Sequence, residues 1–382
     1  MSYITGSNSK CGAQIEASTY GVAPAGAATK LRMTSESLRA TYNRLDEGVL
    51  LGNKTVPQQE VGSVGVDGGV NTVLNPSFID WLLYATLGQK TDSADVVYDC
   101  ETSGKEVVCH ETVYTLRDYA YQDSTAGHEA EGAKGYLPSS TIRIDRGTEG
   151  FTYTGMTVSS LALEASSQDF VKANISFTGY KENFDASNTY TADSQLGSYK
   201  CTKAKLWPAS AGSDDILEFS RFTSWDACPI SEVYDVENTN LTIDNGIQTV
   251  PATYCSGLYA NRPTFGQRSV TMNCNVPYSE GFDTFRKAFY SNEDPAMLAL
   301  MLMFGSKEKI SYTPTGLSSD VTEPAHQVFV ILPNVSITDS SANVGGDALV
   351  DGSFTGTAVS DGTHEPLKII VRNYEMRDIQ NP

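Results

Sequence analysis

Positive charge is scarce in this sequence. Its 382 residues include 27 Lys plus Arg against 46 Asp plus Glu, which leaves a formal net charge of −19. Proteins that hold nucleic acid do so largely through Lys and Arg on the phosphates. The charge balance therefore excludes a protein that grips nucleic acid by its backbone. If DNA is a partner, it is one that this protein does not hold.

Long hydrophobic runs are missing as well. The longest, Ala296–Phe304, is far shorter than the roughly 20 residues of a membrane-spanning helix. The N-terminal stretch MSYITGSNSKCGAQ lacks the basic start and apolar core of a signal peptide. We therefore expect a soluble protein that is made in a cytoplasm and has no membrane partner.

Cysteine and histidine are few and scattered. Seven Cys, an odd number without regular spacing, do not form a disulfide framework, and the chain has four His. The one local cluster is CETSGKEVVCH, in which Cys100, Cys109 and His110 could ligate a metal or the two Cys could close a hairpin. Structural zinc sites usually have closer Cys pairs and four ligands. We therefore favour unpaired thiols in a β-hairpin insertion and predict no metal site.

Catalytic motifs are also missing. The glycine-rich stretch Gly62–Gly69 is not followed directly by a helix or by Lys-Ser/Thr, as a phosphate-binding loop requires. No Gly-x-Ser-x-Gly elbow occurs, and acidic pairs such as Asp214-Asp215 lie in settings typical of turns. We predict no enzymatic activity, no catalytic residues and no cofactor.

What the sequence does contain is an internal repeat. The tetrapeptide Ser-Phe-Thr-Gly occurs at Ser176–Gly179 and again at Ser353–Gly356. Shifting the chain by 177 residues superposes Thr157–Gly179 on Asn334–Gly356 without a gap. Apolar and polar residues alternate in both copies, which predicts two strands joined by a turn, with one buried face.

A second correspondence lies upstream of the first. Ser63-Val64 matches Ser269-Val270 in strands with one apolar face, and each strand leads into a predicted helix. The first helix has Asn75-Pro76 as its start, Phe78, Trp81, Leu82 and Ala85 as its apolar stripe, and Gly88 at its end. The second has Ser279 as its cap and Phe282, Phe285 and Phe289 as its stripe.

The two correspondences predict a duplicated domain. The upstream offset is 206 residues, so the first copy carries 29 extra residues, which we place in the polar stretch Thr91–Gly135. The predicted domains are residues 1–185, with an inserted loop at about 91–135, and residues 186–382. The predicted fold class is mainly β: two tandem β-sandwich or partly closed barrel domains, each with a flanking α-helix.

The order of these features resembles the tail tube, or major tail, proteins of long-tailed bacteriophages. The likeness lies in ASTYGVAPAG, TSESLRATYNRLDEGVLLGNKTV, GSVGVDGGVNTVLNPSFIDWLLYATLG and TYTGMTVSSLALEASSQDFVKANISFTGY. It continues in LTIDNG, GQRSVTMNCNVPYSEGFDTFRKAF, LPNVSIT and GSFTGTA.

The resemblance implies a virion protein of the tail, assembled in the host cytoplasm. Neighbouring copies would join their sheets into a ring around a channel, and stacked rings would form the tube through which DNA leaves. Two tandem domains imply a pseudo-sixfold ring of three chains, with a hexamer as the alternative. Long loops would contact the adjacent ring, and a tape-measure protein, a tail tip and a terminator would be partners. The resemblance also favours a strand over a helix for Ala296–Phe304.

Small polar side chains occupy the faces of the predicted strands that do not face the core. These candidate channel-lining residues are Lys172, Asn174, Ser176, Thr178, Ser269, Thr271, Asn273, Asn275, Asp351, Ser353 and Thr355. Neutral polar groups with few cations suit a wall past which a polyanion slides. Ordinary solvated strand faces are also rich in Ser, Thr and Asn.

Two other functions remain open from the sequence. A tail terminator or distal tail protein would share the fold and form one ring without polymerising. An acidic β-sandwich that binds or decorates, such as a capsid decoration protein or an adhesin, would show exposed aromatic residues on loops at one end.

Overall fold

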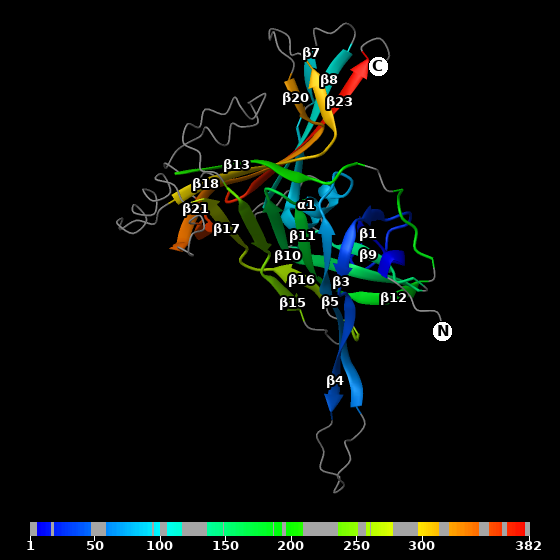
Figure 1. The fold of residues 1–382 in the computed structure, drawn as a ribbon. Coiled ribbons are helices and arrows are strands. Elements are labelled where there is room, and N and C mark those ends of the chain that lie inside the picture. Colours follow the sequence, from blue (N-terminus) through cyan, green and yellow to red (C-terminus); the bar gives the residue numbers. More distant parts are fainter. Residues whose placement is uncertain are drawn as a thin grey trace.

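The described part of the protein consists mainly of antiparallel strands, which confirms the mainly β fold class (Figure 1). The computed structural model describes residues 6–16, 19–46, 59–93, 95–99, 105–116, 136–147, 149–185, 187–192, 196–208, 236–250, 257–259, 261–277, 297–312, 321–343, 351–360 and 365–378.

The first half of the chain contributes one α-helix and twelve strands to the described residues. After a short 3-10 turn, η1 (Gly6–Asn8), these are β1 (Lys10–Ile15), β2 (Thr29–Leu31), β3 (Met33–Glu36), β4 (Arg39–Asp46), β5 (Gln59–Val73), α1 (Ile79–Leu87), β6 (Gly88–Asp92), β7 (Val96–Asp99), β8 (Lys105–Leu116), β9 (Ser140–Asp145), β10 (Gly150–Ser166), β11 (Lys172–Gly179) and β12 (Lys181–Asp185).

The described residues of the second half are strands and their connections. The strands are β13 (Lys200–Pro208), β14 (Asn238–Asp244), β15 (Ile247–Val250), β16 (Asn261–Phe265), β17 (Ser269–Pro277), β18 (Met297–Gly305), β19 (Lys309–Tyr312), β20 (Val321–Pro324), β21 (His326–Asn343), β22 (Asp351–Ala358) and β23 (Lys368–Asp378). The Met-rich segment is thus the strand β18, as predicted.

One large sheet runs through both halves of the chain. Its central strands pair in the order β3 and β4, β5, β11, β10, β14, β17, β22 and β21. β10 also pairs with β12 and with β9, and from β9 the sheet continues through β1 to β2. β21 also pairs with β18, which pairs with β13. On its other branch β21 pairs with β23, β23 pairs with β8, and β8 pairs with both β7 and β6. No series of these pairings returns to its first strand, so across the described residues the sheet is open.

A continuous hydrophobic core lies against one face of this sheet. It joins side chains of both halves, among them Leu82, Leu163, Met272, Phe354 and Ile369. Burial of this apolar surface is the main favourable term in folding. The division into domains 1–185 and 186–382 stays a prediction, because the core is shared between them.

The predicted first helix is confirmed, although it begins later than expected. It starts at Ile79, and the Asn75 side chain instead accepts hydrogen bonds from the backbone N–H and the hydroxyl of Ser77 in the preceding turn. Asn forms such local turns readily, which delays the helix. Its end at Gly88 was predicted correctly: this residue has φ 85°, the left-handed conformation that glycine adopts without strain.

Both copies of the repeated segment form antiparallel hairpins, as predicted. The pairs nearest the turns are Glu164–Lys172 in β10–β11 and Asn343–Asp351 in β21–β22, and each residue of the second pair lies 179 positions after its counterpart in the first. The two copies of Ser-Phe-Thr-Gly are only 177 residues apart in the sequence. The tetrapeptide therefore lies two residues nearer the turn in the second hairpin than in the first. Because this shift is even, each side chain keeps its expected face.

The segment predicted as an insertion contains a hairpin. β7 pairs with β8, and β8 pairs along its length with β23 near the end of the chain. A buried ion pair between Arg372 Nε and Glu111 Oε2, 2.8 Å apart, joins these last two strands. Residues 117–135 of the predicted loop lie outside the described part of the chain, and so does the predicted second helix at Ser279–Phe289.

Two residues of the second half hold the end of α1. Arg268 donates from Nη2 to the Thr86 carbonyl (2.8 Å) and from Nη1 to the Leu87 carbonyl (3.1 Å). Asn245, fully buried, donates from Nδ2 to the carbonyls of Thr86 and Val158 and accepts a bond from Arg268 Nε. The last carbonyls of a helix have no partner within it and favour a cation nearby. The two halves are therefore joined at the carboxyl end of α1.

We expect Arg268→Met to destabilise the protein by about 1–3 kcal/mol, because the substitution keeps the apolar stem but removes the donors to two helix carbonyls. Urea unfolding followed by circular dichroism, at a concentration too low for assembly, measures the change. The control Arg44→Met, at an exposed site on β4, should change stability by less than about 0.5 kcal/mol. Equal stability of Arg268→Met and the unmodified protein would contradict the capping role.

Candidate functional site

The candidate site is the face of the central strands that points away from the core, which we call the polar face. Paired residues on adjacent antiparallel strands share a face, so the register identifies its members. In strand order they are Ser35, Arg39, Thr41, Asp67, Gly69, Asn71, Thr178, Ser176, Asn174, Lys172, Ser160, Ala162, Glu164, Ser166, Asn238, Asn240, Thr242, Asp244, Ser269, Thr271, Asn273, Asn275, Ser353, Thr355, Thr357, Asp339 and Ser341.

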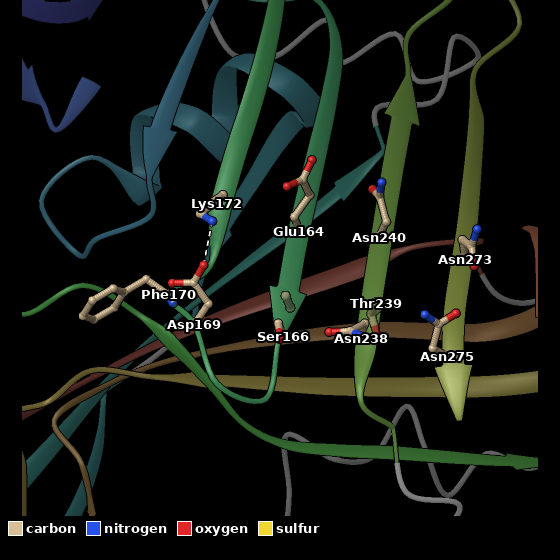
Figure 2. Close-up of a pocket in the computed structure, with 11 residues that line it drawn as sticks. Glu164, Ser166, Asp169, Phe170, Lys172, Asn238, Thr239, Asn240, Asn273 and Asn275 are labelled. Carbon is tan, nitrogen blue, oxygen red and sulfur yellow. Dashed lines mark hydrogen bonds and ion pairs between the residues drawn. The ribbon is translucent and has the colours of Figure 1, made fainter. Parts of the chain in front are cut away.

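Asparagines form the centre of the polar face. Asn238 pairs with Asn275, and Asn240 pairs with Asn273, across β14 and β17. All four side chains are exposed, while the residues between them along each strand are buried. Figure 2 shows these amides projecting from β14 and β17 beside Glu164 of β10, where they line a hollow. Each amide offers both donors and acceptors, so these four side chains can hydrogen-bond to water and carry no charge themselves.

The cations on the described part of this face are each matched by a carboxylate. Lys172 Nζ lies 2.6 Å from Asp169 Oδ2 in the β10–β11 turn (Figure 2), and Arg39 Nε lies 3.4 Å from Asp67 Oδ1. The hydrogen bond with Lys172 lowers the pKa of Asp169, and the same bond raises the pKa of Lys172. Both groups are therefore charged at neutral pH and neutralise each other locally.

Further carboxylates give the polar face an acidic balance. Glu164, Asp244 and Asp339 are exposed on it, and the Glu164 carboxylate accepts a hydrogen bond from Asn174 Nδ2 at 2.7 Å. Uncompensated carboxylates repel phosphate groups, and neutral amides neither attract nor repel them strongly. The polar face is therefore hydrophilic and, on balance, acidic.

The structure brings the predicted residues of both halves together on one face. Those of β17 and β22 lie on adjacent strands, and those of β11 lie in the same sheet with β10 and β14 between. The backbone of Asp351 pairs with that of Pro277 in this sheet. Whether this face lines a channel stays a prediction. The sequence reasoning missed the contributions of β10 and β14, although Asn238, Asn240, Thr242 and Asp244 show the same period of two that identified the others.

Metal-binding side chains do not gather in the part of the chain that the structure describes. No group of three or more His, Cys, Asp or Glu that could hold a metal ion occurs there. His110 lies 2.5 Å from Asp95 and 3.7 Å from Glu375 by its two ring nitrogens, whereas Cys100 lies outside the described residues. Within the same ranges, no helix has the length and apolarity needed to cross a membrane.

Comparison with known families agrees with this geometry. The model of a family described as phage tail tube protein matches residues 6–358, nearly the whole chain. The chain belongs to the phage tail tube protein family. No curated protein matches it. Members of this family are structural components of the virion tail, which suggests a role without catalysis. The resemblance noted in the sequence is thereby confirmed.

The alternation of faces can be tested on β17 of this tail tube protein. Burial raises the pKa of the Cys274 thiol to about 12, so at pH 8 it is neutral and shielded from reagents. We expect Asn273→Cys and Asn275→Cys to react with a maleimide in the folded subunit while Cys274 does not. Mass spectrometry of the labelled peptides gives the extent of reaction, with urea-unfolded protein as the control. Equal labelling of all three positions would contradict the alternation.

Proposed function

We propose that this protein is a tail tube subunit whose chains form stacked rings, with the polar face turned toward a central channel through which DNA leaves the virion. The observation that carries the proposal is the single sheet that continues from the first half into the second. A sheet that already spans two repeats needs only to continue through further chains to surround a channel.

The ring contains three chains in this proposal, each supplying two tandem domains to a pseudo-sixfold arrangement; a ring of six chains is the alternative. The repeated hairpins support the duplication. Each chain has a mass of 41.2 kDa, so a ring of three would weigh about 124 kDa.

The electrostatics support passage of DNA without binding. The chain carries a net charge of −19, and its polar face combines neutral amides, unmatched carboxylates and locally neutralised cations. Retaining DNA would need several Lys or Arg directed at the phosphates. In this proposal the function is geometric and electrostatic, with no chemical step.

The β4–β5 arm supports the stacking of rings. It projects from one end of the molecule, opposite the end formed by β7, β8 and β23 (Figure 1). Tyr42 and Leu45 on this arm are 55% and 57% exposed, an unusual placement for large apolar side chains. Contact with the next ring would bury them. The tape-measure protein, the tail tip and the terminator are further partners in this proposal, and assembly takes place in the cytoplasm of the bacterial host.

Negative-stain electron microscopy with rotational averaging tests the ring, and mass photometry counts its chains. We expect rings with six densities at ~124 kDa, and tubes at high concentration. Particles of six chains would replace the trimer by the hexamer. Rings that never stack, even on a tail tip, would favour the terminator role. Monomers alone, with a tail tip present, would contradict the proposal.

The apolar arm gives a second test. We expect Leu45→Asp to leave rings intact but to shorten or abolish tubes, because a carboxylate would be buried without a partner between rings. Asn43→Asp, at another exposed site on the same strand, adds the same charge and should have a smaller effect. The measurement for both variants is tube length in electron micrographs. Normal tubes from Leu45→Asp would exclude this arm from stacking.

The neutrality of the polar face gives a third test. We expect rings of the double variant Asn240→Arg/Asn273→Arg to retard a short DNA duplex in a gel at low salt and to release it as salt rises. Unmodified rings, and rings carrying Asn240→Gln/Asn273→Gln, should not retard it. Retardation by the unmodified rings would contradict a channel that does not bind DNA.

A further inference from the structure

We infer that Arg146 is a positioning residue for the β4–β5 arm: its contacts at the base of the arm fix the direction in which the arm leaves the sheet. The inference rests on the proposed stacking of rings, because an arm with a fixed direction presents Tyr42 and Leu45 to the next ring at the same place in every chain. It follows from the way in which the backbone of one residue, Leu38, is held.

The arm begins where β5 passes the end of its partner β11. Residues 66–73 of β5 pair with β11 in the central sheet, whereas residues 59–65 lie beyond β11 and pair with β4. In Figure 1 the arm projects from the end of the sheet where β3 and β12 lie. Val64 also donates from its N–H to the Leu258 carbonyl at 2.7 Å. The direction of the arm is therefore decided at its base, by this contact of β5 and by the start of β4.

The chain that pairs with β5 is interrupted at Ser37 and Leu38, just before the arm. β3 ends at Glu36 and β4 begins at Arg39, and both pair with β5. Gly68 of β5 lies opposite this gap with φ 127°, and a Cβ there would lie 2.4 Å from the Ser37 carbonyl oxygen, so the position requires glycine. Because glycine permits many backbone conformations, the gap would act as a hinge unless other contacts held it.

Side chains, not β5, hold the backbone of Leu38 in this gap. Ser37 remains attached to β5, because its N–H donates to the Gly69 carbonyl at 2.9 Å and its hydroxyl accepts from the Gly69 N–H at 3.0 Å. The Leu38 N–H instead donates to Glu36 Oε2 at 3.0 Å, and the Leu38 carbonyl accepts from Arg146 Nη2 at 2.9 Å. Leu38 is only 2% exposed, so both groups need partners within the protein.

Arg146 and Glu36 form one unit that holds both of these backbone groups. Arg146 Nε lies 2.8 Å from Glu36 Oε1, and Arg146 Nη2 lies 3.0 Å from Glu36 Oε2, so the pair is bidentate. The hydrogen bond with Glu36 raises the pKa of Arg146, which keeps the guanidinium charged. Removing Arg146 would therefore free the Leu38 carbonyl and loosen the carboxylate that holds the Leu38 N–H.

Strands of the sheet hold Arg146 itself in place. Its guanidinium lies 4.5 Å from the ring centroid of Phe151 on β10. The hydroxyl of Tyr153, a fully buried residue of β10, accepts from Arg146 Nη2 at 3.1 Å and lies 3.1 Å from the Leu38 carbonyl oxygen. The same hydroxyl lies 2.9 Å from Oε1 of Glu182 on β12. Arg146 thus connects the base of the arm to β10 and β12.

Pulsed electron paramagnetic resonance tests the direction of the arm in single subunits, at a concentration too low for assembly. Spin labels are attached through azide-bearing residues at Asn43 on the arm and Asn240 on the central sheet, both exposed, so that the seven native cysteines stay unlabelled. We expect a narrow distribution of distances between the labels in the unmodified protein. In Arg146→Met the distribution should be roughly twice as wide, because the base of the arm loses its donors and opens locally.

The matched control is Arg143→Met on the neighbouring strand β9. Arg143 also donates to two backbone carbonyls, those of Gly26 at 2.6 Å and Pro24 at 2.8 Å, but neither belongs to the arm. Its replacement should leave the distance distribution unchanged. A distribution that stays equally narrow in Arg146→Met would overturn the inference and leave the proposed rings untouched.

Arg146→Lys is measured in place of Arg146→Met if the latter does not fold, as judged by circular dichroism. Lysine can pair with Glu36, but it has no planar fork with which to reach the Leu38 carbonyl and the Tyr153 hydroxyl at the same time. The distance distribution should therefore widen again. In that case a distribution as narrow as that of the unmodified protein would overturn the inference.

Tube length connects the direction of the arm to stacking. We expect Arg146→Met to form rings at the same concentration as the unmodified protein but tubes roughly half as long or shorter, because the arm is no longer preorganised. Arg143→Met should give normal tubes. Normal tubes from Arg146→Met despite a widened distribution would overturn the role of Arg146 in stacking. Absence of rings from the unmodified protein would overturn the proposed function, while the distances in single subunits would still decide whether Arg146 directs the arm.

Discussion

Backbone pairing between β10 and β14 is the contact on which the rest of this structure depends. It joins the first half of the chain to the second across seven residue pairs, from Ser160–Asp244 to Ser166–Asn238. Without it, each half would end in an open strand edge and would expose part of the shared core. With it, the hairpins β10–β11 and β21–β22 belong to one sheet, and the polar sides of their strands form one surface.

The two faces of the sheet have different roles: one is buried and stabilises the fold, and the other remains in solvent. Apolar side chains from both halves fill the core side, with α1 packed among them, and stability comes from their removal from water. The other face carries amides, hydroxyls and carboxylates that gain nothing from burial and remain in contact with solvent. A substitution on the polar face therefore changes the surface that contacts solvent and other molecules. A substitution one residue away along the same strand changes the packing of the core.

The end of α1 shows how the two halves depend on each other. Arg268 and Asn245 belong to the second half, yet they satisfy carbonyl groups at the end of a helix in the first. The helix is short, and short helices derive most of their stability from tertiary contacts. The junction is consequently held by specific side-chain hydrogen bonds as well as by strand pairing.

The sequence by itself determined the β-rich class, the repeated hairpins, the helix ending at Gly88 and the alternation of polar and buried residues on β11, β17 and β22. All of these follow from local periodicity or from the preference of single residues such as glycine. It did not determine the true register of the repeat, the start of α1 after the Asn75 turn, or the place of β10 and β14 beside the predicted polar strands. Only the tertiary structure decided these, because pairing between strands distant in sequence depends on which backbone groups and core side chains meet, and no local pattern of residues specifies the partner.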